Sequence, residues 1–98
     1  MTTPLTLTQG PGPDARVVLK AVGEIDMTNT AVLATALEGA PGRLVIDLTE
    51  VDYLDSAGLS VLFAHADRIE LVITGLLEPV VTISGLADLT TVQIPNGT

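Results

Sequence analysis

The sequence has no cysteine, no tryptophan and few basic residues, and each shortage excludes a class of function. Without cysteine there can be no disulfide, no thiolate zinc site and no cysteine nucleophile. Four bases against 12 acids give a formal net charge of −8. Binding to a nucleic-acid backbone needs a concentrated basic surface, and anionic lipids would repel an acidic chain. We therefore expect no nucleic-acid partner, and a protein partner whose surface is basic or neutral.

Long apolar runs are also missing, although 47% of the 98 residues are hydrophobic. The uncharged stretches at 27–37 and 79–87 fall well short of the ~20 apolar residues that cross a bilayer. The first 13 residues contain no basic n-region and no apolar h-region, which a signal peptide would have. We therefore expect a cytoplasmic protein without membrane insertion, folded as a single domain over residues 1–98.

Residues that could carry catalysis are scarce. His65 is the one histidine, so no second histidine completes a metal-binding pair. The sequence has neither a phosphate-binding P-loop nor a Gly-x-Ser-x-Gly nucleophile motif. We interpret His65 as a solvated helix residue, and we expect no enzymatic activity, no cofactor and no metal.

Apolar periodicity and turn residues predict eight elements in the order β-β-α-β-α-β-α-β. The strands are expected at 5–8, 16–22, 43–48, 71–74 and 91–94, with Gly23 ending the second. One helix should run from the cap residues at 26–30 to about Glu38, a second over 56–68, and a short third from Pro79. Strands separated by helices need crossover connections. The expected fold is therefore α/β, with helices packed against a mixed, largely parallel sheet.

Four acids lie within nine residues that contain no base: Asp47, Glu50, Asp52 and Asp55. This segment is expected to leave the central strand and enter the second helix, at the edge of the sheet where ligands commonly bind. A calcium loop would need glycine at its sixth position, where Asp52 stands. The segment could be a solvated acidic loop or a surface that binds a partner or small ligand.

Ser56 lies beside this segment, at the expected start of the second helix. An Asp-Ser pair at such a position commonly caps a helix, because a side-chain oxygen accepts a hydrogen bond from a free backbone amide. The same position suits phosphorylation, because the amides and the helix dipole favour a dianion there. Both interpretations are open for Ser56 on these residues alone.

An ordered set of short motifs resembles a known family. Its members are Gly23-Glu24-Ile25-Asp26 with Thr30-Ala31, Val45-Ile46-Asp47-Leu48, Asp55-Ser56-Ala57-Gly58-Leu59, Leu71-Val72-Ile73-Thr74-Gly75-Leu76 and Gly85-Leu86. Over about residues 16–94 the chain resembles STAS domains, and in particular bacterial anti-sigma factor antagonists.

The resemblance implies a partner and a switch. Antagonists of this type bind an anti-sigma factor, a serine kinase of the histidine-kinase-like ATPase superfamily, and thereby free a sigma factor. The kinase phosphorylates the serine directly after the aspartate, here Ser56, and the complex dissociates until a phosphatase removes the phosphate. The positions that the resemblance assigns to the partner surface are Glu24, Asp26, Asp55, Ser56, Ala57 and Gly58.

Two departures from the family pattern qualify this expectation. Ala57 stands where many relatives have serine or threonine. Only nine residues separate Gly75 from Gly85, about one helical turn fewer than expected, so the third helix should be a single turn or absent. An alternative within the same family is a regulatory or structural subunit of a transporter ATPase that is not phosphorylated.

Overall fold

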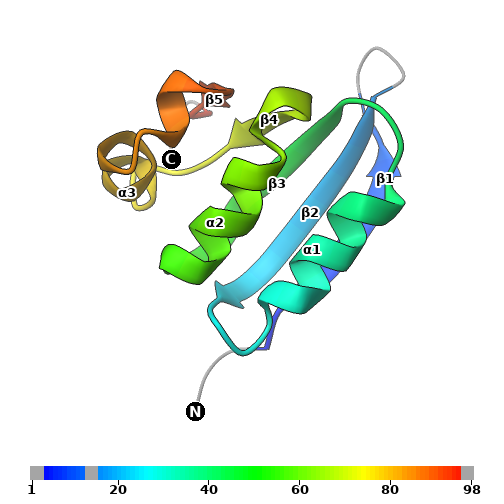
Figure 1. Cartoon of the computed structure of the whole chain (residues 1–98), viewed down its shortest axis with the longest axis horizontal. Helices are drawn as coiled ribbons and strands as arrows, with labels where there is room; N and C mark the ends of the chain where they lie inside the picture. The colour runs from blue at the N-terminus through cyan, green and yellow to red at the C-terminus, as the bar shows by residue number, and fades with distance from the viewer. Residues whose placement is uncertain (1–3, 13–15, 96–98) are drawn as a thin grey trace.

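The computed structural model describes residues 4–12 and 16–95, which form five strands, three α-helices and two 3₁₀ turns (Figure 1). In chain order these elements are β1 (Thr6–Pro11), β2 (Val17–Ile25), α1 (Thr30–Gly39), β3 (Leu44–Leu54), α2 (Ser56–Ala64), η2 (Ala66–Arg68), β4 (Ile69–Val72), α3 (Glu78–Ile83), η3 (Leu86–Asp88) and β5 (Thr91–Gln93). The predicted order of strands and helices is confirmed.

The five strands form one sheet in the order β1-β2-β3-β4-β5. β1 runs antiparallel to β2, and the other neighbouring pairs are parallel. Each parallel pair is connected through one α-helix, which is the crossover that parallel strands need. The predicted mixed, largely parallel sheet is therefore confirmed.

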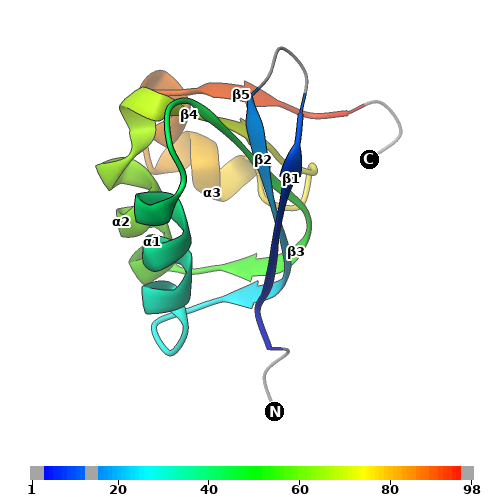
Figure 2. The same ribbon diagram turned by 90° about the vertical axis from the view of Figure 1, so that its right-hand side faces the viewer.

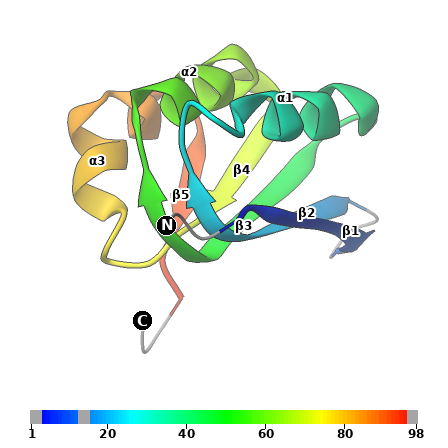
Figure 3. The same ribbon diagram turned by 90° about the horizontal axis from the view of Figure 1, so that it is seen from below.

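The helices lie on one face of the sheet, as Figures 2 and 3 show. β2 alternates accordingly: Leu19, Ala21 and Ile25 are buried towards the helices, whereas Lys20 and Val22 are exposed on the opposite face. α1 contributes Leu33 and Leu37 to the core, and α2 contributes Leu59 and Leu62. No buried polar or charged residue interrupts this core in the described part of the chain.

The opposite face of the sheet carries charged side chains that pair across strands. Arg16 Nη1 lies 3.3 Å from Glu70 Oε1, and Gln93 donates to the other Glu70 oxygen at 3.3 Å. Lys20 Nζ lies 2.6 Å from Glu50 Oε2, and this hydrogen bond and charge raise the pKa of Lys20. Val45, whose register partners are Val18 and Glu70, is only 6% exposed.

Several predicted strand boundaries are wrong, and pairing explains why. Gly23 does not end β2, which continues to Ile25 beside Leu54 of β3. Gly23 has φ +117°, and a Cβ there would lie 2.3 Å from the Pro4 carbonyl oxygen. Only glycine therefore fits at this position, where β2 continues close to the residues before β1. β3 likewise runs six residues beyond its predicted end, because its second half pairs with the end of β2.

The other differences concern the ends of elements. β1 extends to Pro11 instead of ending at Thr8, and positions 13–15, between β1 and β2, lie outside the described residues. α2 ends at Ala64, and the 3₁₀ turn η2 occupies the last positions predicted as helix. β4 begins and ends two residues before the predicted strand. The third helix does form, as a six-residue helix with Pro79 in its first turn.

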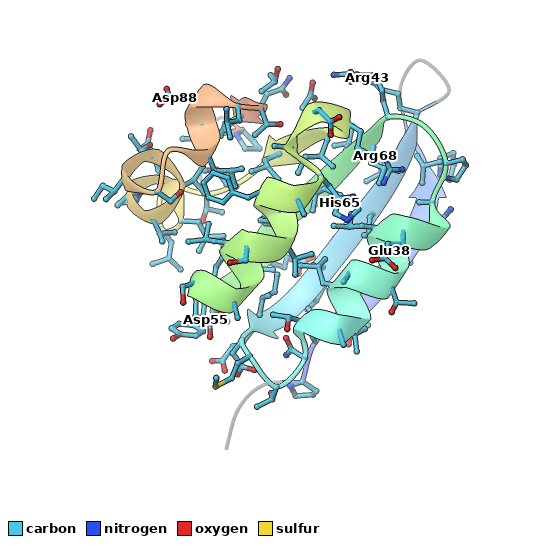
Figure 4. The ribbon with its side chains drawn as sticks, viewed as in Figure 1. Glu38, Arg43, Asp55, His65, Arg68 and Asp88 are labelled. Atoms are coloured by element: carbon cyan, nitrogen blue, oxygen red, sulfur yellow. The ribbon has the colours of Figure 1, made fainter. Side chains whose placement is uncertain are left out.

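Arg68, directly before β4, forms hydrogen bonds to the backbone at the end of α1. Its guanidinium donates to the carbonyls of Leu37 (2.8 Å), Gly42 (3.0 Å) and Ala40. It also lies 3.4 Å from His65 Nδ1 (Figure 4). His65 is half-buried directly after α2, beside this arginine, so it is less exposed than the sequence suggested.

Within the described residues, no helix is long and apolar enough to cross a membrane.

Candidate functional site

The site forms where the carboxyl ends of β2 and β3 lie side by side. Glu24 pairs with Tyr53, and Ile25 pairs with Leu54. The chain leaves β2 through a loop at residues 26–29 that leads into α1, and it leaves β3 through Asp55, which leads into α2. The parallel pairing therefore brings together two loops that are almost 30 residues apart in the sequence.

Asp55 holds these two loops together. Its Oδ1 accepts a hydrogen bond from the Gly58 N–H at 3.1 Å, which makes it the N-cap of α2. Its Oδ2 accepts from the Met27 N–H at 3.2 Å, and its own N–H donates to the Ile25 carbonyl at 3.2 Å. Asp55 is half-buried and has this structural role, and its contact with a partner stays a prediction.

Gly58 has no room for a side chain. A Cβ at this position would lie 2.6 Å from Ile25 Cγ2 and 2.7 Å from Leu54 Cδ1. The first turn of α2 therefore packs directly onto the ends of β2 and β3. Gly58 is buried, and its assignment to the partner surface stays a prediction.

Ser56 is the first residue of α2 and is exposed. In the described part of the chain its hydroxyl has no hydrogen-bond partner, and its carbonyl accepts from Ser60 Oγ at 3.0 Å. Because Asp55 caps the helix, the Ser56 hydroxyl is not used for capping and faces solvent beside the free amides of the first turn. Ala57 follows it and is half-buried.

Side chains of the loop between β2 and α1 form hydrogen bonds within the loop and to the end of β2. Asp26 Oδ1 accepts from the Thr28 hydroxyl at 2.5 Å and from the Thr28 N–H at 2.9 Å. These bonds lower the pKa of Asp26, the hydroxyl having the larger effect. Asn29 Nδ2 donates to the Glu24 carbonyl at 2.8 Å, and Asn29 Oδ1 accepts from the Asp26 N–H at 3.0 Å. The loop is therefore a fixed surface next to Ser56.

Two large apolar side chains that the sequence reasoning did not select are exposed on this surface. Met27 is 76% exposed and Tyr53 is 49% exposed. With Glu24, Asp26, Thr28 and Asp55 they line an open depression of about 500 Å³. Tyr53 is the one tyrosine of the chain. Its position two residues before Asp55 is the feature of the sequence that could have indicated its place at the site.

Not all predicted acids gather here. Glu24, Asp26, Asp52 and Asp55 lie at the carboxyl ends of β2 and β3, and we call them the acidic pole. Asp47 instead lies in the middle of the sheet, with its register partner Lys20 on β2, and it accepts from Thr49 at 2.7 and 2.9 Å. Glu50 pairs with Lys20. The prediction of one acidic loop from Asp47 to Asp55 is therefore wrong, because β3 continues through most of it.

Among the described residues, no group of three or more His, Cys, Asp or Glu side chains could hold a metal ion.

A family model described as "Mlab, STAS domain" matches residues 11–93. The chain belongs to the STAS domain family. The match spans both strands and both loops of the site, including Asp55 and Ser56. No curated protein sequence matches the chain significantly.

Solved STAS structures share this fold. An anti-sigma factor antagonist from Mycobacterium paratuberculosis is 26% identical, with 92% of this chain and 86% of that chain covered and a TM-score of 0.80. The anti-sigma factor antagonist SpoIIAA in its unphosphorylated form is 17% identical, covering 94% and 90%, with a TM-score of 0.69. A STAS-domain antisigma-factor antagonist from Rhodobacter sphaeroides is 20% identical, covering 76% and 89%, with a TM-score of 0.55.

Proposed function

We propose that this STAS domain is an anti-sigma factor antagonist, which binds an anti-sigma factor and so releases a sigma factor. The observation that carries the proposal is an exposed serine at the start of α2, directly after the capping aspartate, in a chain 26% identical to the Mycobacterium paratuberculosis antagonist over 92% of its length. The partner that fits is a serine kinase of the histidine-kinase-like ATPase type. The domain itself performs no catalysis and acts in the cytoplasm.

The surface around Ser56 suits such a partner. Met27 and Tyr53 offer exposed apolar contact area, and large apolar side chains of this kind commonly anchor interfaces. The acidic pole surrounds them, so basic groups on the partner would match it in charge and speed association. Asp26 is fixed by a hydrogen bond within its own loop, and Asp55 is fixed by a hydrogen bond from Met27 of that loop, so the surface needs little reordering on binding.

Phosphorylation of Ser56 would then act as a switch. A phosphoserine adds about −1.5 to −2 charges, and the first turn of α2 tolerates them without unfolding. Asp55 cannot swing away from the phosphate, because both of its oxygens accept backbone hydrogen bonds. An acidic group of the partner held 4 Å from the phosphate would be repelled by ~1 kcal/mol in water and by ~4 kcal/mol at an effective dielectric of 20. A dianion inside the contact must also lose its hydration, and an added binding cost of ~2.8 kcal/mol would lower the affinity about a hundredfold.

The direct test is incubation of the protein with its anti-sigma kinase and ATP. We expect one phosphoryl group on the peptide that contains Ser56, and none in Ser56→Ala. Ser60→Ala is the matched control, because Ser60 is exposed one turn later on the same helix. It should be phosphorylated like the wild type. Phosphate on Ser60 with Ser56 unmodified would contradict the assignment. A serine phosphatase should restore the unmodified protein.

A second candidate is a subunit that regulates or supports a transporter ATPase without phosphorylation. The observation that favours this candidate is the description of the matching family model, "Mlab, STAS domain", which does not refer to sigma factors. This candidate uses the same Met27–Tyr53 surface but makes no use of a free Ser56 hydroxyl. It predicts that Ser56→Ala and Ser56→Glu support ATPase binding equally, whereas an anti-sigma factor should bind only Ser56→Ala well.

A further inference from the structure

Met27 carries the one sulfur atom in the described part of the chain. The sequence has two methionines and no cysteine, and Met1 lies outside the described residues. Peroxides oxidise the thioether of methionine to a sulfoxide, which turns a flexible apolar side chain into a polar one. With no thiol in the chain to compete for a peroxide, Met27 is the internal position at which such an oxidant would act.

The side chain of Met27 is open to an oxidant. It is 76% exposed, and among the large apolar side chains of the described residues only Ile83 is more exposed. The depression that Met27 lines is also lined by the acids Glu24, Asp26 and Asp55. These charges would repel an anionic oxidant but not a neutral one. The class of oxidant that fits is therefore a neutral hydroperoxide, of which hydrogen peroxide is the simplest.

Oxidation of Met27 would leave the fold in place. Its backbone N–H donates to Asp55 Oδ2 at 3.2 Å, and the rest of the loop is held by the side chains of Asp26 and Asn29. None of these bonds uses the thioether, and Met27 is not part of the hydrophobic core. A sulfoxide would therefore form on a loop that keeps its conformation, and the change would be confined to the surface.

That surface is the proposed partner contact. Met27 lines the same depression as the exposed ring of Tyr53. The residue that holds the Met27 backbone, Asp55, directly precedes Ser56 in the chain. A change of polarity at Met27 therefore falls where apolar contact with the partner is expected, close to the serine that phosphorylation would modify.

We propose that Met27 is an oxidation site through which a hydroperoxide weakens binding of the anti-sigma factor; this inference rests on the proposed function. In the step, the thioether sulfur attacks one oxygen of the peroxide, so that an S–O bond forms and the O–O bond breaks. The sulfur loses two electrons and the peroxide gains them. The transferred oxygen gives its proton to the departing hydroxide, which leaves as water. Methionine sulfoxide reductases reverse the change, so the modification can act as a switch.

The sulfoxide should weaken the complex about tenfold or more, because it replaces an apolar anchor and places a polar oxygen inside the contact. The first test needs no partner. Hydrogen peroxide should add one oxygen atom to the peptide that contains Met27, at a rate close to that in the urea-unfolded chain, and leave the circular dichroism unchanged. Oxidation of the folded protein that is many times slower would overturn the assignment of an open site.

The second test is isothermal titration of the anti-sigma factor with the protein before and after peroxide treatment. Met27→Leu is the matched control, because leucine is apolar and of similar size but has no sulfur. Peroxide should weaken the wild type and should not change the affinity of Met27→Leu from that of its own untreated form. An equal loss in Met27→Leu would assign the effect to Met1 or another residue and overturn the proposal.

Reduction separates this effect from irreversible damage. Treatment of the oxidised protein with the reductases for both sulfoxide epimers should restore the original affinity. Binding by the untreated protein tests the proposed function, whereas the difference between oxidised and reduced protein tests the role of Met27. Equal binding of the two forms would overturn the oxidation switch and leave the proposed function standing.

Discussion

The carboxylate of Asp55 accepts one backbone hydrogen bond on each oxygen, one from its own helix and one from the loop after β2. This arrangement frees the neighbouring hydroxyl of Ser56 and fixes a negative charge beside it. Of the two residues that could cap the helix, Asp55 forms the cap, and Ser56 keeps an exposed hydroxyl.

Asp55→Ala should therefore destabilise the domain. Loss of an N-cap costs ~1 kcal/mol, and loss of the bond to Met27 adds ~1 kcal/mol, so we expect ~2 kcal/mol in urea unfolding. Asp52→Ala is the control, because Asp52 is exposed on β3 and should change stability by less than ~0.5 kcal/mol. Equal effects in the two variants would contradict the role assigned to Asp55.

Gly58→Ala tests the close packing of α2 on the strand ends. The added methyl would lie 2.6 Å from Ile25 Cγ2, so the helix must shift, and overpacking of this kind costs ~1–3 kcal/mol. Gly39→Ala is the matched helical control, because a Cβ there meets nothing within 4 Å. It should leave stability unchanged or raise it by up to ~1 kcal/mol. Thermal unfolding of both variants makes the comparison.

The pKa of Asp26 predicts a pH dependence. Thr28 lowers this pKa below its ordinary value of 3.8 in the folded chain. A lowered folded pKa means that the carboxylate contributes stability above the unfolded pKa, and that this contribution is lost as the pH falls through the folded pKa. NMR titration should therefore show Asp26 titrating below 3.8, and Thr28→Val should move it upwards because the hydroxyl is the larger cause. An unchanged value in Thr28→Val would contradict this explanation.

At the scale of elements, Arg68 joins the end of α1 to β4 through three carbonyls. Carbonyls at a helix C-terminus have no partner within the helix, so a cation that donates to them stabilises the end. Arg68→Met keeps the apolar stem and removes the donors. We expect a loss of ~1–3 kcal/mol and faster amide exchange in the last turn of α1. Arg43→Met should have little effect, since Arg43 is exposed and makes one long contact, at 3.5 Å to Asp67 O.

The elements themselves were largely predictable from the sequence. Continuous apolar residues identified β3, and the spacing of Leu59, Leu62, Phe63 and Ala66 identified α2. Strand ends were not predictable, because they depend on pairing. Gly23 and the acids of β3 are typical of turns and loops in isolation, and only the neighbouring strand makes them extended. The hydrogen bonds of Arg68 go to carbonyls that lie 26–31 residues earlier in the sequence, so no local pattern indicates them.

The site was partly predictable for the same reason. Ser56 and Asp55 form a local motif, and the sequence placed both correctly at the start of α2. The exposure of Met27 and Tyr53 was not apparent, because apolar residues near strand ends are usually buried and only the packed structure shows which remain outside. The hydrogen bond that joins Asp55 to the loop after β2 comes from Met27, which lies 28 residues earlier.

For the whole molecule, the charge of −8 is unevenly distributed. The acidic pole gathers at one end of β2 and β3, the open sheet face pairs its charges across strands, and the β1–α1 side is almost free of charge. One polypeptide of 98 residues thus has three surfaces that differ in chemistry. The proposed anti-sigma factor contact uses the acidic pole.

The central claim is that phosphorylation of Ser56 controls binding at the acidic pole. The most direct measurement is isothermal titration of the anti-sigma factor with the unmodified protein and with the protein phosphorylated at Ser56. The binding cost estimated for a phosphate inside the contact predicts affinity about a hundredfold lower for the phosphorylated form, with both forms equally folded by circular dichroism. Equal affinities of the two folded forms would contradict the claim.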